Sequence, residues 1–400
     1  MDDAFDAVPL VLKPREDRRL RAGHLWVFSN EVDTDRTPLS DFFAGQPVAV
    51  LDHREHLIGT GYVNPHTLIC ARLLSRSPKH PWGPSLLVHR LKVALSLREL
   101  LFDRPYYRLV HGEGDLLPGL VVDRYGDYLG VQLTTAGMDY AREAVISALE
   151  RVLRPRGMIL RNDVAVRGLE GLEQGVERIG EIGPRVSIEE NGVRFEADPE
   201  GGQKTGWFFD QRENRQRVAR LVRGRRVLDL FTYGGGFGVT AAAGGAEAVV
   251  CVDSAVDTAE RVATNAALNG VADRVQAVRA DVFDFLKAQR DQGGHFDLVI
   301  VDPPAFIKRR KDFKAGLEGY RRLNQLAIQA VAKDGLLVSC SCSQPLERAT
   351  LVEQVLGAAR HLDRNLQLFA VGEQAADHPR HPAIPETEYL KCLFMRVLRS

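Results

Sequence analysis

The second half of the chain alternates short apolar runs with stretches of helical spacing, and this pattern constrains the fold more than any other feature. It predicts strands at 227–231, 248–253, 275–279, 296–301 and 336–340. Between them it predicts helices at 239–243, 258–268, 283–289 and 320–331. Strands separated by about 10–15 helical residues form βαβ units. Such units build a parallel, doubly wound sheet, so we expect an α/β domain with a Rossmann-like fold.

A glycine-rich turn at 234–238 joins the first predicted strand to its helix. Glycines let the backbone approach a ligand closely, and the helix N-terminus favours a phosphate or carboxylate. The turn lacks the third glycine of the dinucleotide fingerprint, because Val239 stands there. Asp253 ends the second strand, where a carboxylate can accept hydrogen bonds from both hydroxyls of a ribose. We therefore predict a cofactor with a ribose here, with a helix N-cap as the alternative role of the acid.

The end of the chain favours one class of nucleotide-like cofactor. Strands predicted at 366–371 and 389–397 have no helix between them, which indicates an antiparallel hairpin at the sheet edge. This ending is similar to that of class I methyltransferases, whereas nucleotide-binding dehydrogenases usually end otherwise. The similarity implies that Asp281, at the end of the third strand, meets the adenine amino group of S-adenosylmethionine. Here too an N-cap is the alternative role.

Two further strand ends carry groups that suit methyl transfer to carbon 5 of a pyrimidine. The fourth strand ends in Asp302-Pro303, and the fifth runs into Ser339-Cys340-Ser341-Cys342-Ser343. Carbon 5 is too weakly nucleophilic to accept a methyl group unaided. A thiolate that adds to carbon 6 makes an enolate-like adduct, and an acid at N3 relieves the developing charge. Methylation of an amino group would need no thiol, and it typically uses an aromatic residue where this chain has Ala305.

Three motifs together resemble one family, the bacterial 23S ribosomal RNA large-subunit cytosine-5 methyltransferases. They are DPPAF at 302–306, SCS at 341–343 and KTGWFFDQRENR at 204–215. The resemblance implies that Cys342 is the nucleophile, that Asp302 takes part in catalysis and that Cys340 serves packing. It implies S-adenosylmethionine as cofactor, and the residues expected to hold it are Arg212, Phe231, Tyr233, Gly235, Gly236, Asp253, Asp281, Asp302 and Pro303.

The first half of the chain matches the RNA-holding part of that family. Short strands predicted at 48–52, 57–63 and 68–74 are followed by a proline-rich break at 75–84. The resemblance implies three domains, a β-rich PUA-like domain at 1–78, a small α+β domain at 79–190 and the methyltransferase domain at 191–400. It also implies ribosomal RNA as the partner. The residues predicted to contact RNA are Arg15, Arg18, Arg19, Arg21, Lys308, Arg309 and Arg310.

Composition restricts where RNA can bind. Lys and Arg total 53, as do Asp and Glu, so any electrostatic footprint for RNA must be local. One candidate is the run 306–322, which holds seven basic residues against two acids, although a solvated helix face is the alternative.

The five cysteines contain no C-x-x-C pair, which favours neither a disulfide framework nor a zinc site. The acidic start and the lack of a long apolar run predict a cytoplasmic protein with no membrane partner.

Several alternatives remain open at this stage. A uracil-5 RNA methyltransferase combines the same Asp-Pro-Pro with one late cysteine, so cytosine depends on the family resemblance. A dehydrogenase, or an RNA-binding protein with a degenerate cofactor domain, leaves Cys342 without a role. The family often has lysine where this chain has Ala305, and Lys308 is a candidate to supply that charge. The base that removes the carbon 5 proton, the target nucleotide and the oligomeric state, with a homodimer among the alternatives, stay open.

Overall fold

The computed structural model describes residues 4–203 and 205–399. They form two compact units. Of the described residues, the N-terminal unit comprises 4–187, 197–203, 205–209 and 376–387, and the C-terminal unit comprises 188–196, 210–375 and 388–399. None of the helices in the described ranges has both the length and the apolar character needed to cross a membrane.

The first part of the N-terminal unit is a five-stranded sheet with the order β1-β3-β4-β5-β2. Its strands are β1 (Val8–Val11), β2 (Trp26–Phe28), β3 (Gln46–Leu51), β4 (Leu57–Val63) and β5 (Ile69–Ser75). β1 runs parallel to β3, and the other neighbours are antiparallel. Apolar side chains from all five strands share one core with Leu20 of α1 (Arg18–Arg21). The expected β-rich module is confirmed.

A second sheet in the same unit has the order β10-β9-β8-β7-β6. The strands are β6 (Tyr106–His111), β7 (Leu120–Tyr125), β8 (Tyr128–Leu133), β9 (Gly157–Arg161) and β10 (Val176–Gly180). Helices α2 (Pro84–Leu101) and α4 (Arg142–Leu153) pack their apolar residues into one core with it. Sequence patterning missed β10, because this edge strand is almost entirely exposed and has no apolar alternation.

A late segment of the chain, residues 376–387, belongs to the N-terminal unit. The fully buried guanidinium of Arg98 forms an ion pair with Asp115 and donates a hydrogen bond to the carbonyl oxygen of Asp377 at 2.8 Å. The Asp377 carboxylate in turn accepts a hydrogen bond from the backbone N–H of Arg108 at 2.9 Å. The sequence prediction had placed this segment in the domain at 191–400, because nothing local indicates these long-range contacts.

The C-terminal unit is built on a seven-stranded sheet with the order β15-β14-β13-β16-β17-β19-β18. The strands are β13 (Arg226–Leu230), β14 (Ala248–Asp253), β15 (Val275–Arg279), β16 (Phe296–Val301), β17 (Val331–Ser341), β18 (Arg364–Gly372) and β19 (Lys391–Arg399). The first five in spatial order are parallel, and β19 runs antiparallel to both of its neighbours. The predicted α/β fold and the closing antiparallel pair are confirmed.

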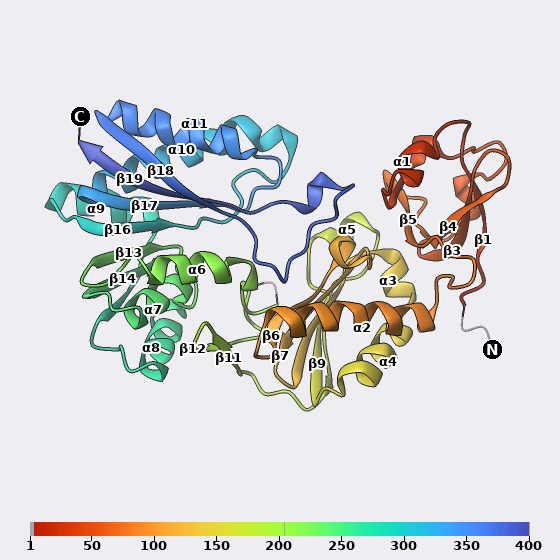
Figure 1. Cartoon of the computed structure of the whole chain (residues 1–400), viewed down its shortest axis with the longest axis horizontal. Coiled ribbons are helices and arrows are strands. Elements are labelled where there is room, and N and C mark those ends of the chain that lie inside the picture. Colours follow the sequence, from red (N-terminus) through yellow and green to blue (C-terminus); the bar gives the residue numbers. More distant parts are fainter. Residues whose placement is uncertain (1–3, 204, 400) are drawn as a thin grey trace. The chain divides into compact units, whose positions relative to one another are not determined.

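Helices cover both faces of this sheet (Figure 1). On one side lie α9 (Val282–Gln292), α10 (Phe313–Ala330) and α11 (Arg348–His361), which share a core with the strands. On the other side lie α6 (Arg212–Ala219), α7 (Gly236–Ala243) and α8 (Thr258–Leu268). The predicted bounds of α8 match the structure, whereas α11 was not predicted.

Helix α10 begins seven residues earlier than predicted, at Phe313 instead of residue 320. Gly316 and Gly319 interrupt its first turns, and glycine is a poor helix former. Both glycines have a packing reason. A Cβ on Gly316 would lie 2.3 Å from the side chain of Ile307, and one on Gly319 would lie 3.2 Å from the ring of Phe306. The two glycines therefore let α10 approach the loop that follows Asp302.

Candidate active site at the carboxyl edge of the C-terminal sheet

The sheet brings the predicted acid and nucleophile to neighbouring strand ends. Asp302 follows β16 directly, and Cys342 follows β17. These two strands are parallel neighbours, with Val301 paired to Ser339. The thiol of Cys342 points at the carbonyl oxygen of Pro303 across 3.9 Å. Ligands bind outside the carboxyl ends of strands in such sheets, so both groups lie where a substrate can reach them.

Cys342 differs from the other cysteines in its exposure. All five cysteines are free thiols, and Cys70, Cys251, Cys340 and Cys392 are buried, whereas Cys342 is partly exposed. The Cys340 thiol lies 3.0 Å from that of Cys392 in the core between β17 and β19. A nucleophile must be accessible, so the exposure favours Cys342 over Cys340.

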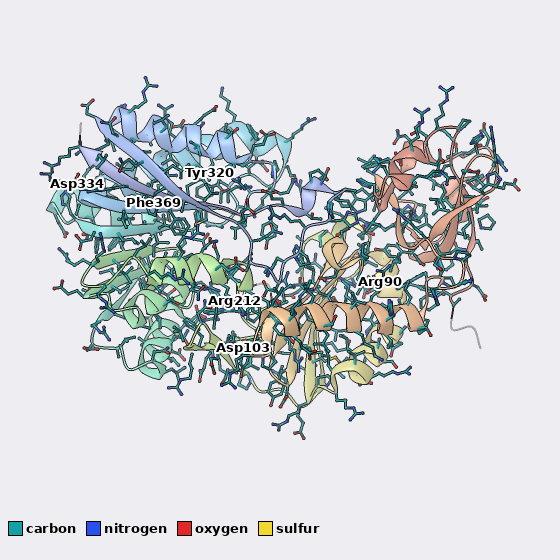
Figure 2. The ribbon with its side chains drawn as sticks, viewed as in Figure 1. Arg90, Asp103, Arg212, Tyr320, Asp334 and Phe369 are labelled. Carbon is teal, nitrogen blue, oxygen red and sulfur yellow. The ribbon has the colours of Figure 1, made fainter. Side chains whose placement is uncertain are left out.

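The serines on either side of Cys342 are buried and tie the strand end to its surroundings. Ser341 donates a hydrogen bond to the hydroxyl of Tyr320, which lies on α10 (Figure 2). The same hydroxyl lies 2.9 Å from Oγ of Ser343. Ser343 Oγ also accepts a hydrogen bond from the backbone N–H of Ile307 at 3.0 Å. The serines of the SCS motif thus join the Cys342 segment to the loop after Asp302.

Asp302 receives one hydrogen bond from a residue that sequence reasoning did not single out. The amide nitrogen of Gln211 donates to Asp302 at 2.9 Å. The side-chain amide of Asn214 donates to Oε1 of the Gln211 side chain at 2.7 Å, which orients the Gln211 amide toward the carboxyl group. Both residues belong to the 204–215 motif, in which only Arg212 was predicted to have a role.

The pKa of the Asp302 carboxyl group is raised to about 7, although the residue as a whole is partly exposed. Surrounding protein displaces water from it, and this loss of solvation is the largest cause. The nearby carboxylates of Asp210 and Asp229 raise the pKa further. The charge of Arg215 and the hydrogen bond from Gln211 oppose the shift. Near neutral pH Asp302 is therefore divided between a protonated and an ionised form.

The turn between β13 and α7 carries unusual backbone conformations. Phe231, Tyr233 and Gly235 have φ angles of +62°, +55° and +83°, in the left-handed region. For residues other than glycine this conformation costs roughly 1 kcal/mol or more, and such strain gathers at ligand sites. Asp253 holds the turn, since its carboxylate accepts hydrogen bonds from the backbone N–H groups of Tyr233 and Ala255, each at 3.0 Å. Gly236 opens α7 directly after the turn.

Two other predicted cofactor residues have clear structural partners. Asp281 is exposed and caps α9, because one of its oxygens accepts hydrogen bonds from the N–H groups of Phe283 and Asp284. The N-cap alternative is thus present, and the cap leaves the second carboxylate oxygen available. Arg212, on α6 (Figure 2), is buried with its Nε 3.8 Å from Glu190. Its predicted contact with the cofactor stays a prediction.

The residues predicted to contact RNA fall into two groups. Arg19 forms an ion pair with Glu31, and Arg21 forms ion pairs with Asp17 and Asp52. The remaining predicted side chains are exposed and, within residues 4–203 and 205–399, form no salt bridge; they are Arg15, Arg18, Lys308, Arg309 and Arg310. Arg21 is exposed too, so what separates the groups is the salt bridge, and the group without salt bridges suits contact with phosphates better.

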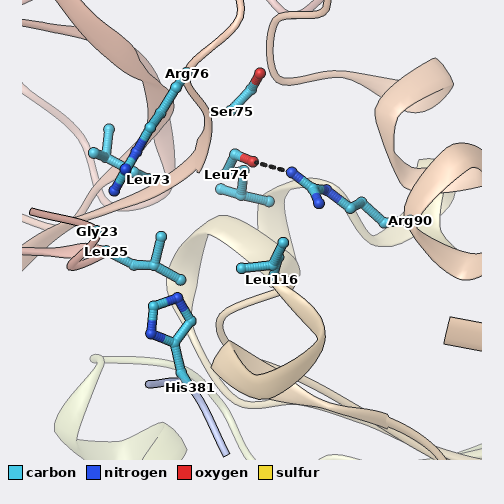
Figure 3. Close-up of a pocket in the computed structure, with 9 residues that line it drawn as sticks. All are labelled: Gly23, Leu25, Leu73, Leu74, Ser75, Arg76, Arg90, Leu116 and His381. Atoms are coloured by element: carbon cyan, nitrogen blue, oxygen red, sulfur yellow. Dashed lines mark hydrogen bonds between the residues drawn. The ribbon is translucent and has the colours of Figure 1, made fainter. Parts of the chain in front are cut away.

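A pocket of about 240 Å³ in the N-terminal unit is lined by two further arginines (Figure 3). Arg76 and Arg90 line it together with His381. The Arg90 guanidinium lies 3.4 Å from the carbonyl oxygen of Leu74, while its Nε is buried without a hydrogen bond in the described structure. Neither arginine was among the predicted RNA contacts, because they come from the linker and from α2, where isolated basic residues carry no motif.

Comparison with known proteins defines the class. Residues 177–396 match the family model of S-adenosylmethionine-dependent methyltransferases, and residues 10–76 match that of PUA-like domains. Two solved structures share the fold over 97% of this chain and 100% of their own. One, assigned as a SAM-dependent methyltransferase from Streptococcus mutans, is 20% identical with a TM-score of 0.81. The other, assigned as a methyltransferase and complexed with SAH, is 22% identical with a TM-score of 0.83.

Sequence relatives narrow the class to one family. A protein of Tolumonas auensis named ribosomal RNA large subunit methyltransferase I is 38% identical over 393 residues, which is 96% of this chain and 98% of that one. Its namesake in Escherichia coli O157:H7 is 36% identical over 399 residues, or 98% and 100%. The chain belongs to the ribosomal RNA large subunit methyltransferase I family. The predicted family and the S-adenosylmethionine cofactor are confirmed, and the dehydrogenase interpretation is wrong.

Proposed function

We propose that this protein transfers a methyl group from S-adenosylmethionine to carbon 5 of a cytosine in 23S ribosomal RNA, through a covalent bond to Cys342. The observation that carries the proposal is the accessible Cys342 thiol 3.9 Å from the Pro303 carbonyl oxygen, one strand end from Asp302. The names of the relatives support ribosomal RNA as substrate. A ribosomal substrate agrees with the expected cytoplasmic location.

The residues around the glycine turn fit the cofactor. Gly235 adopts a left-handed backbone, and a Cβ there would lie 3.0 Å from the side chain of Val239, so glycine lets the turn pack closely against α7. The Asp253 carboxylate is held in place by two backbone N–H groups and keeps lone pairs for ribose hydroxyls. When bound here, S-adenosylmethionine supplies an electrophilic methyl group. Asp281 would meet its adenine, and Tyr233, Gly236 and Pro303 belong to the same edge of the sheet.

Covalent catalysis assigns distinct tasks to Cys342 and Asp302. The Cys342 thiolate forms a bond to carbon 6 of the base, which pushes an electron pair toward carbon 5. Protonated Asp302 donates a hydrogen bond to N3 and so stabilises the charge that spreads there. After carbon 5 is methylated, loss of its proton and cleavage of the sulfur–carbon bond restore the aromatic ring and the thiolate. The base that accepts the proton is not assigned.

The raised pKa of Asp302 is compatible with cytosine as the substrate base. N3 of cytosine is a hydrogen-bond acceptor, whereas N3 of uracil carries a proton and is a donor. A carboxyl group whose pKa is raised to about 7 can donate at neutral pH, as an acceptor base requires. A fully ionised carboxylate would suit uracil instead. A pKa of about 7 populates both forms near neutral pH, so the preference for cytosine over uracil is proposed from the family resemblance.

RNA binding is proposed to follow a three-domain organisation, with a PUA-like domain at 1–78, a central domain at 79–190 and the methyltransferase domain at 191–400. The family match at residues 10–76 supports the first of these. The exposed Arg15 and Arg18, together with Lys308–Arg310, are the proposed phosphate contacts. A homodimer stays a prediction, and sedimentation equilibrium of the purified protein tests it.

Mapping of 5-methylcytosine tests the proposal. Bisulfite sequencing of 23S ribosomal RNA from a deletion strain should show one modified cytosine lost. A plasmid with the wild-type gene should restore it, and one with Cys342→Ala should not. Cys340→Ala serves as the matched control and should restore it. Loss of a 5-methyluridine, measured by mass spectrometry of the same RNA because bisulfite does not distinguish it from uridine, would support the uracil alternative. An unchanged modification pattern in both measurements would contradict the proposed function.

A further inference from the structure

Lys391 is a lysine buried beside the proposed nucleophile. It opens β19 and pairs with Ser341 of β17 in the antiparallel register, one residue before Cys342. Only 4% of the residue is exposed. Its Nζ donates hydrogen bonds to the carbonyl oxygen of Ser343 at 2.6 Å and to that of Tyr389 at 2.8 Å. The ammonium group is therefore fixed against the peptide segment that carries Cys342.

Burial of the Lys391 ammonium group costs free energy unless a nearby anion compensates for the lost solvation. Moving an ammonium group out of water costs several kcal/mol when no anion pairs with it. Within the described residues Lys391 forms no salt bridge. Glu388, the acid that acts on it electrostatically, lies 3.2 Å from Arg348 instead. The direct partners of the Lys391 ammonium group are two neutral carbonyl oxygens. The group can therefore still stabilise a nearby anion.

The electrostatics around Lys391 point to the thiol as that anion. Burial lowers the pKa of Lys391 to about 8, and Arg348 lowers it too, whereas Cys342 and Glu388 act to raise it. An interaction that raises a lysine pKa stabilises the ammonium form, and by reciprocity the ammonium group stabilises the Cys342 thiolate. Tyr320 on α10 also interacts with Cys342, and the pKa of its phenol is raised. Neutral Tyr320 cannot balance a thiolate, whereas the Lys391 ammonium group can.

We propose that Lys391 is a positioning residue that holds Cys342 in its thiolate form and fixes the strand end on which the thiol lies. It touches neither the base nor the cofactor in this role. The thiol proton passes to solvent, and the Lys391 ammonium keeps its own proton. The cation offsets the nearby Asp302 carboxyl group, whose ionised form disfavours the thiolate. The inference rests on the proposed function of Cys342.

The test is the pH dependence of alkylation at Cys342, which needs neither RNA nor methyl transfer. Full-length protein is treated with iodoacetamide from pH 6 to 10, and peptide mass spectrometry gives the rate at Cys342 alone. Wild-type Cys342 should titrate below about 8.5, the ordinary value for a free cysteine. In Lys391→Met the apparent thiol pKa should rise by about one unit or more, a tenfold loss of thiolate at pH 7. Lys391→Arg should keep most of the wild-type profile.

Activity provides the second readout. Relative to wild type at the same pH, Lys391→Met should have a kcat about tenfold lower at pH 7 and a smaller deficit toward pH 9, with an unchanged KM for S-adenosylmethionine, because only the thiolate fraction changes. Lys333→Met, an exposed lysine at the opposite end of β17, is the control and should change neither profile. Superimposable alkylation profiles for wild type and Lys391→Met would overturn the inference. So would a wild-type thiol that titrates above 8.5, a measurement that no misfolded variant can obscure.

Failure of the proposed function and failure of the proposed role of Lys391 would give different results. If Cys342→Ala still methylates RNA, the proposed function fails, while the alkylation profiles still report whether Lys391 stabilises the thiolate. If Cys342→Ala is inactive and the Lys391→Met profile is unchanged, the proposed function stands and the role of Lys391 is wrong.

Discussion

The thiol of Cys342 lies 3.9 Å from the carbonyl oxygen of Pro303, although 39 positions separate the two residues in the chain. Parallel pairing of β16 and β17 brings the two strand ends together. The hydrogen bond from the N–H of Ile307 to Ser343 Oγ then fixes the loop after one strand to the segment after the other. The nucleophile and the acid are thus held on one joined pair of loops, as preorganised catalysis requires.

Ser343→Ala tests whether this joint matters for the reaction. The change leaves the buried N–H of Ile307 without its acceptor, which costs about 1–3 kcal/mol of unfolding free energy. Methyl transfer should fall, because the loops no longer hold their spacing, while calorimetric affinity for S-adenosylmethionine should change less, because Asp253 and the glycine turn follow other strands of the sheet. Ser96→Ala, an exposed serine on α2, is the control for urea unfolding and turnover. Wild-type turnover in the destabilised Ser343→Ala protein would argue against the joint.

The pH–rate profile of methyl transfer should have a limb that falls with rising pH, because of the titration of Asp302. Its pKa is raised to about 7, and the protonated form donates to N3, so the active fraction declines as pH increases through 7. Asp302→Asn donates at every pH and should lose this limb between pH 6 and 8. It cannot supply a full proton, so kcat should also drop by about 100-fold or more. Asp281→Asn, at an exposed position, should keep the wild-type limb. An unchanged limb in Asp302→Asn would assign the titration to another group.

Cofactor affinity should depend on Asp253 and on the free oxygen of Asp281. Charge-assisted hydrogen bonds are worth about 1.5–3 kcal/mol, so Asp253→Ala should weaken S-adenosylmethionine binding by roughly 10- to 150-fold. For Asp281 the sharper variant is Asp281→Ser, because serine also caps a helix and leaves α9 stable. Isothermal calorimetry should then show weaker binding without a lower melting temperature. Wild-type affinity in Asp281→Ser would leave this residue only its capping role.

Substitutions of the predicted RNA-contact residues that form no salt bridge should weaken RNA binding more than substitution of the paired ones. Removal of one phosphate-binding side chain should reduce the salt slope of RNA affinity by about 0.7 on a single strand. Alanine at Lys308, Arg309 and Arg310 together should therefore reduce it by about 2, and alanine at Arg15 and Arg18 by about 1.4. Arg19→Ala should mainly destabilise the fold, because it breaks the ion pair with Glu31. Filter binding from 50 to 300 mM salt measures the slopes, with Lys333→Ala as control. Equal slopes in all variants would place the RNA interface elsewhere.

The architecture was largely predictable because its signals are local. Strand β16 and helix α8 have the predicted bounds, since an apolar run and a helical spacing appear within a single short window. The placement of Asp302 and Cys342 follows from topology, because successive parallel strands end at one edge. Helix α11 also carries a local signal in its buried Leu351 and Val355, which the prediction overlooked.

The supporting residues of the site could not be predicted, because their roles depend on distant contacts. Gln211 reaches Asp302 across 91 positions, and Lys391 reaches the Ser343 carbonyl oxygen across 48. Gln211 stands in a polar run before α6, and Lys391 stands in a strand, where a lysine usually indicates an exposed position. No pattern of spacing shows that either side chain turns inward. Burial in the folded chain gives them their electrostatic effect.

Trapping of the covalent intermediate is the decisive experiment for Cys342 as the nucleophile. Ribosomal RNA transcribed with 5-fluorocytidine is incubated with the protein and S-adenosylmethionine, because fluorine at carbon 5 blocks the final proton loss. We expect a denaturation-resistant protein–RNA adduct whose peptide map places the nucleotide on Cys342. The adduct should be absent in Cys342→Ala and present in Cys340→Ala. An adduct on another residue, or full methylation of unmodified RNA by Cys342→Ala, would contradict covalent catalysis by Cys342.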